Sequence, residues 1–224
     1  MTQRPKFSTL TIGMFSQYKY AWYEPYGKAN YSRNSPCCPK CGRAVGSLYW
    51  EPPYHVILKQ PRNIGDFIAG PGGCDFLVSH RFLNIYAQER LSGIEKVLPI
   101  QVCRMGTSKK RKSQDPPEIC GVYLRHSLTQ VKHSEMGVTW MSSPNPDYCR
   151  LCGPGGGGVG GVIKSWEKIV VDDQNWQGED IFYAINFSGS ILLSEKAAHV
   201  IANYSLTNAA ITPCEEAKFS KGLL

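Results

Sequence analysis

Two stretches of the chain, FLVSHRFLNIYAQERLSGIEKV at 76–97 and ILLSEKAAHVIANYSLTNAAIT at 191–212, align without a gap at an offset of 115 residues. Leucine, serine and alanine recur at the same places in both, and other positions hold conservative replacements such as Arg81 and Lys196. The identical pairs include Leu77/Leu192, Ser79/Ser194, Ala87/Ala202 and Leu91/Leu206. The alignment indicates that one segment of the fold is present twice.

Three shorter features precede both stretches in the same order. They are CPKCG at 38–42 and CRLCG at 149–153, Trp50-Glu51 and Trp166-Glu167, and GDF at 65–67 and GEDIF at 178–182. Because their offsets lie close to that of the long stretches, a chance match explains them poorly. Long repeat arrays need more copies than two, so we expect a pseudo-symmetric pair of units within one domain.

Each unit has the order cysteine knuckle, strand, strand, helix, strand. The fold class predicted is therefore α+β, with two pseudo-symmetric α/β units at 36–100 and 149–212 inside a single domain, 1–224. Between them, 101–148 is predicted as a β insertion that carries a basic loop and has no counterpart in the second unit. A split, zinc-ribbon-like four-cysteine site is expected to join the units.

Both long stretches contain a strand that ends at a serine and is followed by apolar residues at helical spacing. A serine at a helix start accepts a hydrogen bond from a free backbone N–H of the first turn. Neither Ser79 nor Ser194 lies in the G-x-S-x-G context of a catalytic serine. We therefore predict helices at about 80–91 and 195–204, capped by these two serines, with Gly or Asn beyond their ends.

The cysteine knuckles carry the strongest chemical signal. In each, two thiols are two residues apart and are followed by a glycine, which permits a positive φ and turns backbone N–H groups toward the sulfurs. A closed structural zinc site takes four ligands in tetrahedral geometry, so two knuckles are expected to share one ion. We predict that Cys38, Cys41, Cys149 and Cys152 bind one structural zinc ion per chain.

The spacing of the knuckles argues against this site, since 107 residues separate the two pairs where a compact ribbon has about 15–20. The duplication reduces the difficulty, because symmetry-related knuckles can meet at a common axis. A redox Cys-x-x-Cys pair and a site that has lost its metal are the alternatives. Cys37 competes with Cys38 as a ligand, although the glycine after Cys41 favours the pair 38/41.

Nothing in the sequence points to export or a membrane. The N-terminus lacks a continuous apolar segment, and no run reaches the roughly 18 apolar residues of a membrane span, so we expect a cytoplasmic protein. Nine cysteines in such a chain favour metal binding over a disulfide framework. Outside the knuckles, small buried hydrophobes are expected at Cys74, Cys103, Cys120 and Cys214.

The glycine run 154–161 formally contains G-x-G-x-x-G at Gly156, Gly158 and Gly161. A dinucleotide site needs a strand before such a motif and a helix after it, whereas this run follows a knuckle and precedes β-branched residues. A P-loop is also excluded, because Ile163 stands where glycine must precede the lysine. We interpret the run as a flexible linker.

The net charge of +7 is concentrated in the loop 104–112. A solvated loop tip is the ordinary interpretation of such a cluster, and a contact with nucleic acid or an acidic partner is the alternative. No metal-ligand trio with an open position, no Ser/His/Asp order and no close carboxylate pair stands out. The sequence therefore predicts no enzymatic activity.

Together, the knuckles and the C-terminal stretch DIF…NFSGSILLSEKAAHVIANYSLTNAAI resemble the double-CXXCG motif proteins, a family first grouped as myxobacterial paralogues. The resemblance covers the knuckles and nearly all of 178–212, and more loosely 65–100. That family includes immunity proteins encoded beside contact-delivered polymorphic toxins. The resemblance implies that Cys38, Cys41, Cys149 and Cys152 are the paired cysteines and that the partner is a cognate toxin.

Three functions follow as hypotheses, of which the third is a degenerate enzyme of unrecognised type. The first is a non-enzymatic immunity protein that binds and neutralises a bacterial toxin and contains a structural zinc site. The second is a zinc-ribbon nucleic-acid-binding or regulatory protein, suggested by the knuckles and the basic loop. Immunity proteins against nucleases are commonly acidic, so the positive charge argues against a nuclease as the toxin.

Overall fold

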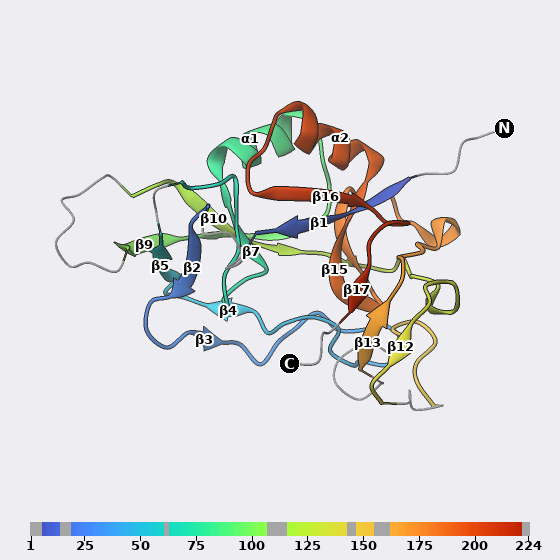
Figure 1. Cartoon of the computed structure of the whole chain (residues 1–224). Coiled ribbons are helices and arrows are strands. Elements are labelled where there is room, and N and C mark those ends of the chain that lie inside the picture. Colours follow the sequence, from blue (N-terminus) through green and yellow to red (C-terminus); the bar gives the residue numbers. More distant parts are fainter. Residues whose placement is uncertain are drawn as a thin grey trace.

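Strands outnumber helices in the part of the chain that the computed structural model describes, which is residues 6–13, 19–60, 63–106, 116–142, 147–154 and 162–220. Two α-helices and seventeen strands are found in these residues, so the predicted α+β class is confirmed (Figure 1). The glycine run at 155–161 and the basic residues at 109–112 lie outside them. Within the described residues, neither helix is long and apolar enough to cross a membrane.

The largest sheet has five strands in the order β11-β14-β15-β1-β16. Its members are β11 (His126–Ser127), β14 (Ile181–Ala184), β15 (Phe187–Ser194), β1 (Phe7–Ile12) and β16 (Ala209–Pro213). All neighbours are antiparallel except β11 and β14. The N-terminal strand β1 therefore lies between two C-terminal strands, with Leu10 opposite Ile191 on one side and Ile211 on the other.

A second sheet has four antiparallel strands in the order β6-β7-β10-β8. Its members are β6 (Phe67–Ile68), β7 (Phe76–Ser79), β10 (Ile119–Leu124) and β8 (Ile94–Pro99). Strand β10 comes from the segment predicted as an insertion, yet it pairs with both β7 and β8. Strand β10 lies between β7 and β8 in this sheet, as β1 lies between β15 and β16 in the five-stranded sheet.

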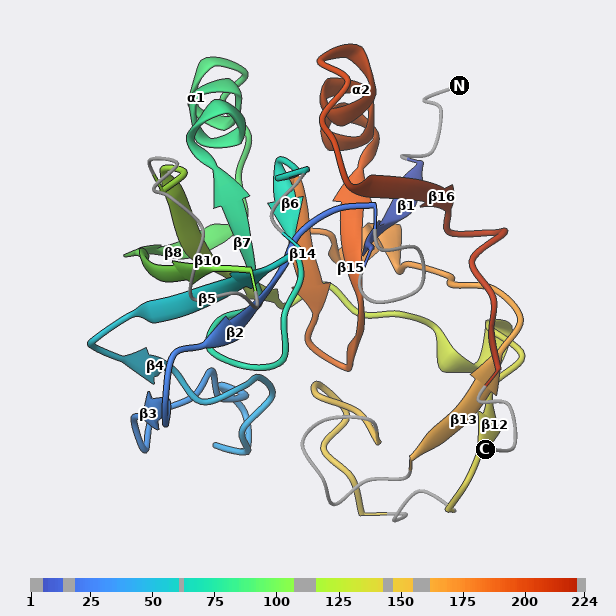
Figure 2. The ribbon, with the colours of Figure 1, turned by 60° about the vertical axis from the view of Figure 1, so that its left-hand side comes forward.

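Three smaller sheets complete the strand set. They are β2-β5-β9, formed by Trp22–Pro25, His55–Lys59 and Gln101–Met105; β12-β13-β17, formed by Thr139–Trp140, Ile163–Trp166 and Phe219–Ser220; and β3-β4, formed by Asn30–Tyr31 and Trp50–Glu51. Short 3-10 helices lie at His133–Glu135 and Asp173–Asn175. In Figure 2, β2-β5-β9 lies next to the four-stranded sheet and β12-β13 lies beyond the five-stranded one.

The two helices, α1 (His80–Gln88) and α2 (Glu195–Asn203), lie side by side on one side of the molecule (Figures 1 and 2). The predicted caps are confirmed, because Ser79 Oγ accepts from Phe82 N and Ser194 Oγ accepts from Ala197 N, each at 3.1 Å. Helix α1 ends three residues earlier than predicted, since Arg90 adopts a φ of 49°. A left-handed residue cannot continue a right-handed helix.

One hydrophobic cluster joins both sheets and both helices. It includes Phe82 of α1, Ile201 of α2, Val122 of β10 and Leu10 of β1, all buried. A second cluster packs on the β2-β5-β9 side and a third on the β12-β13 side. The helices and the two larger sheets therefore share a core, and the buried knuckle cysteines belong to a separate small cluster.

Candidate metal centre

The first knuckle is a tight turn held by its own backbone. Gly42 N donates to Cys38 O at 2.9 Å, and Cys38 N donates to Arg43 O at 2.7 Å. Gly42 has a φ of +73°, which a residue with a Cβ rarely adopts. The turn leaves Cys38 buried and Cys41 exposed.

The second knuckle repeats this geometry. Gly153 N donates to Cys149 O at 2.8 Å, and Gly153 has a φ of +63°. Here the glycine is also required by space, because a Cβ added to it would lie 2.9 Å from Asn186 Cβ. Cys152 is fully buried and Cys149 is half-buried.

The two knuckles meet, although they are far apart in the sequence. Cys38 Sγ lies 3.9 Å from Cys149 Sγ, and Cys41 Sγ lies 3.7 Å from Cys152 Sγ. All four sulfurs are within 4.8 Å of one another. The predicted convergence of these four cysteines is confirmed.

These distances suit a four-coordinate metal ion. Sulfurs bound at about 2.3 Å around a tetrahedral zinc ion are separated by about 3.8 Å. A disulfide would bring two sulfurs to about 2.05 Å, and all four cysteines are free thiols. The group could therefore hold one metal ion with four thiolate ligands.

The electrostatics of the group also favour a cation. The backbone N–H of Cys152 donates to the Cys149 sulfur and lowers the pKa of Cys149 to about 6. Burial raises the pKa of Cys152 to about 12. Four thiols this close cannot all ionise unless a positive charge compensates them.

Side chains from neighbouring elements fix the second knuckle. Gln130 Nε2 donates to the carbonyls of Arg150 and Leu151 at 2.8 and 2.7 Å. The amide of Asn186, at the β14–β15 turn, exchanges two hydrogen bonds of 2.9 Å with the backbone of Val131. Ile185 packs against the cysteines themselves. The knuckle is thus attached to the end of the β14–β15 hairpin.

The other cysteines have different surroundings. Cys74 and Cys214 are buried, as predicted. The prediction is wrong for Cys103, which is exposed because β9 pairs only with β5 and is an edge strand. It is also wrong in part for Cys120, which is only half-buried and contacts a histidine. Cys37 donates to Ser35 O at 3.3 Å and stays outside the four-sulfur group.

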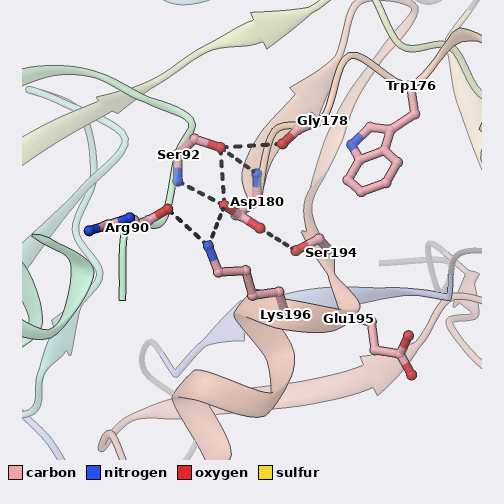
Figure 3. Close-up of a pocket in the computed structure, with 8 residues that line it drawn as sticks. All are labelled: Arg90, Ser92, Trp176, Gly178, Asp180, Ser194, Glu195 and Lys196. Carbon is pink, nitrogen blue, oxygen red and sulfur yellow. Dashed lines mark hydrogen bonds and ion pairs between the residues drawn. The ribbon is translucent and has the colours of Figure 1, made fainter. Parts of the chain in front are cut away.

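A polar junction lies at the start of β14, beside a cavity of about 550 Å³ (Figure 3). Asp180 accepts from Ser194 Oγ at 2.7 Å, from Ser92 N at 3.0 Å and from Ser92 Oγ at 3.1 Å. Lys196 Nζ lies 3.8 Å from the same carboxylate and donates to Arg90 O at 2.9 Å. Because both carboxylate oxygens are engaged, Asp180 serves here as a structural link.

A matching junction surrounds Asp66. It accepts from Ser79 Oγ at 2.7 Å, from Arg81 Nη1 at 2.8 Å, and from Thr207 N and Oγ1 at 2.9 Å each. Each aspartate therefore accepts from the serine that caps the next helix in the chain and from a residue four positions beyond the end of the other helix. Sequence reasoning paired the GDF and GEDIF segments but did not assign these links.

Neither a protein-family model nor a curated protein matches this sequence. The assignment of the metal centre therefore depends on the geometry of its own residues.

Proposed function

We propose that the four thiols bind one structural zinc ion and that the chain is a non-enzymatic immunity protein that binds and neutralises a cognate bacterial toxin. The observation that carries the proposal is the convergence of two CxxCG knuckles, 111 residues apart, into one four-sulfur group. That arrangement agrees with the paired cysteines that the resemblance to the double-CXXCG proteins implies.

Zinc in this group would have a structural role. Four thiolates complete its coordination, whereas a catalytic zinc ion keeps a position open for water or substrate. Cys38 and Cys152 are buried, and Val45 and Ile185 pack around them. An ion held here would link the first knuckle to the end of the β14–β15 hairpin.

We further propose that the two halves arose by duplication and are related by a pseudo-twofold axis. Supporting this, α1 and α2 begin 115 residues apart, and β6-β7-β10-β8 has the same antiparallel order as β14-β15-β1-β16. The links from Asp66 to Thr207 and from Asp180 to Ser92 are reciprocal. On this proposal the metal would lie on the axis, where the two knuckles meet.

Co-expression with the product of the adjacent gene tests the function. We expect that product alone to stop growth, and co-expression of this chain to restore growth through a complex that survives gel filtration. A neighbour that is not toxic, or that forms no complex with the zinc-loaded chain, would contradict the proposal. Binding of nonspecific duplex DNA that weakens steeply with added salt would favour the nucleic-acid hypothesis instead.

Variants separate the role of the metal from that of the toxin-binding surface. Cys149→Ser removes one ligand, whereas Cys103→Ser changes an exposed thiol outside the group. We expect the first to lose zinc, stability and protection together, and the second to keep all three. Zinc analysis by native mass spectrometry should give one ion per chain for the Cys103 variant.

A further inference from the structure

At the start of helix α1, a thiol contacts an imidazole, and the imidazole contacts a carboxylate on its other side. The pairing of β7 with β10 places Cys120 opposite Val78, and His80 follows Val78 by two residues, so Cys120 and His80 are diagonal neighbours on the same face. Cys120 Sγ lies 3.4 Å from His80 Nε2. His80 Nδ1 lies 3.5 Å from Glu118 Oε2 on its other side.

This order sets the role of each group. A carboxylate next to Nδ1 favours the tautomer with the proton on Nδ1, and then Nε2 presents its lone pair to the thiol. A nucleophile, a base that contacts it and a third group that orients the base form the usual arrangement for activating a weak nucleophile. The side chains of His80 and Glu118 are 53% and 83% exposed, so small molecules can reach the cluster.

We propose that Cys120, His80 and Glu118 form a thiol-modification site that reacts with small disulfides, with His80 as the general base and Glu118 as the positioning residue. The site is separate from the four-sulfur group and does not depend on the proposed immunity function.

The reaction is a thiol–disulfide exchange. As His80 Nε2 takes the proton of Cys120, the Cys120 sulfur bonds to one sulfur of the small disulfide, and the disulfide bond breaks. The second sulfur leaves as a thiolate and receives the proton from the imidazolium. Cys120 is thereby oxidised to a mixed disulfide, and half of the small disulfide is reduced to a thiol.

A disulfide suits this cluster better than an acyl substrate. Attack on a carbonyl develops charge on oxygen, which needs donors placed to receive it. In disulfide exchange the charge stays on sulfur, so the three side chains are sufficient.

The need for His80 follows from the surroundings of the thiol. Burial and the charge of Glu118 both raise the pKa of Cys120, so little thiolate forms at neutral pH without a base. Cys103 provides the comparison within the same chain, because it is exposed and has no hydrogen-bonded histidine in the described residues. In the wild type, Cys120 should react faster than Cys103. When His80 is replaced, Cys120 should react more slowly than Cys103.

The test uses the zinc-loaded full chain and oxidised glutathione at neutral pH. Samples are quenched with iodoacetamide over time, and each cysteine is followed by peptide mass spectrometry. We expect Cys120 to form the mixed disulfide at least about tenfold faster than Cys103, since general bases contribute about 10²–10⁴-fold. A Cys120 that reacts no faster than Cys103 would overturn the proposal.

Three variants locate the effect. His80→Gln should slow Cys120 at least about tenfold and leave Cys103 unchanged, and Glu118→Gln should slow it less. His199→Gln, an exposed histidine on α2, is the matched control and should change neither rate. Equal Cys120 rates in the wild type and His80→Gln would overturn the role of the base. Because His80 and Glu118 are exposed, their variants should keep the wild-type melting temperature.

Discussion

Replacing Asp66 with alanine tests whether the aspartate junctions hold the two halves of the chain together. The Asp66 side chain is 7% exposed and accepts four hydrogen bonds, from Ser79, Arg81 and twice from Thr207. The variant leaves the backbone and hydroxyl of Thr207 without these partners. Arg81 is half-exposed, so its guanidinium can hydrogen-bond to water instead. The loss of its bond to Asp66 therefore costs less.

The expected cost follows from these bonds. A hydrogen bond to a charged group contributes about 1.5–3 kcal/mol, and a donor left buried without a partner costs about 1–3 kcal/mol. Counting the two bonds from Thr207 and the one from Ser79 at the lower end of this range, and discounting Arg81, we expect Asp66→Ala to lower the free energy of unfolding by about 4.5 kcal/mol. The free energy of unfolding of a folded protein is about 5–15 kcal/mol in total. The variant should therefore fold but unfold at a lower urea concentration than the wild type.

Urea unfolding followed by tryptophan fluorescence measures the change, with the exposed Glu216→Ala as the control. Burial by itself would raise the pKa of Asp66, but the hydrogen bonds from Thr207 and Ser79 and the charge of Arg81 outweigh it and lower the pKa. The unfolded chain then binds the proton first, so wild-type stability should fall as the pH drops below about 4. Asp66→Asn should lack that part of the slope. A loss below about 1 kcal/mol for Asp66→Ala would refute the reasoning.

Two further comparisons test local features. Gly42→Ala, with open space around its Cβ but a positive φ, should cost about 1 kcal/mol. Gly153→Ala should cost roughly twice as much, because its Cβ also meets Asn186 at 2.9 Å; equal losses in thermal unfolding would count against the close contact. Burial raises the pKa of Asp75 to about 6, above its unfolded value, so its favourable contribution is fully present below about pH 4 and is lost as the pH rises from about 4 through 6. Asp75→Asn should therefore be more stable than wild type at pH 8, by up to about 3 kcal/mol, and similar at about pH 3, as measured by urea unfolding.

Sequence reasoning predicted the parts of the fold that depend on local side-chain patterns. Ser79 and Ser194 could be identified as caps because a serine before an apolar helical pattern has a specific chemical role. The knuckles could be identified because few residue types bind zinc and their spacing is narrow. The repeat then indicated that the knuckles meet, which their distance in sequence would otherwise argue against.

The places of β1 between β15 and β16 and of β10 between β7 and β8 could not be predicted in the same way. Strand pairing uses the backbone, so FSTLTI at 7–12 and ICGVYL at 119–124 occupy corresponding places with little side-chain similarity. The contact between Cys120 and His80 was missed for a related reason. It arises from the register of β7 against β10. Cys120 and His80 are 40 residues apart in the sequence, and no sequence pattern predicts their contact. Cys103 was misassigned because the sequence does not say which strand is an edge.

Removal of the metal should loosen one end of the β14–β15 hairpin and not the other. At one end, Ile181 N donates to Ser92 O at 3.0 Å, beside the Asp180 junction. At the other, Ile185 N donates to Thr129 O at 3.0 Å, beside the second knuckle. Ile181 and Ile185 are four residue steps apart, about 13 Å of extended chain, so the two amides report on separate regions.

If zinc is bound to the four thiols, a chelator should lower the melting temperature, because structural zinc binding is coupled to folding. Hydrogen exchange should then speed up at Ile185 and at Val131, whose N–H donates to Asn186. Exchange at Ile181 should change much less, since the core cluster and Asp180 hold that end without the metal. Uniform acceleration at both ends would show that the ion stabilises the whole chain, and no acceleration at either would rule out a structural metal at the knuckles.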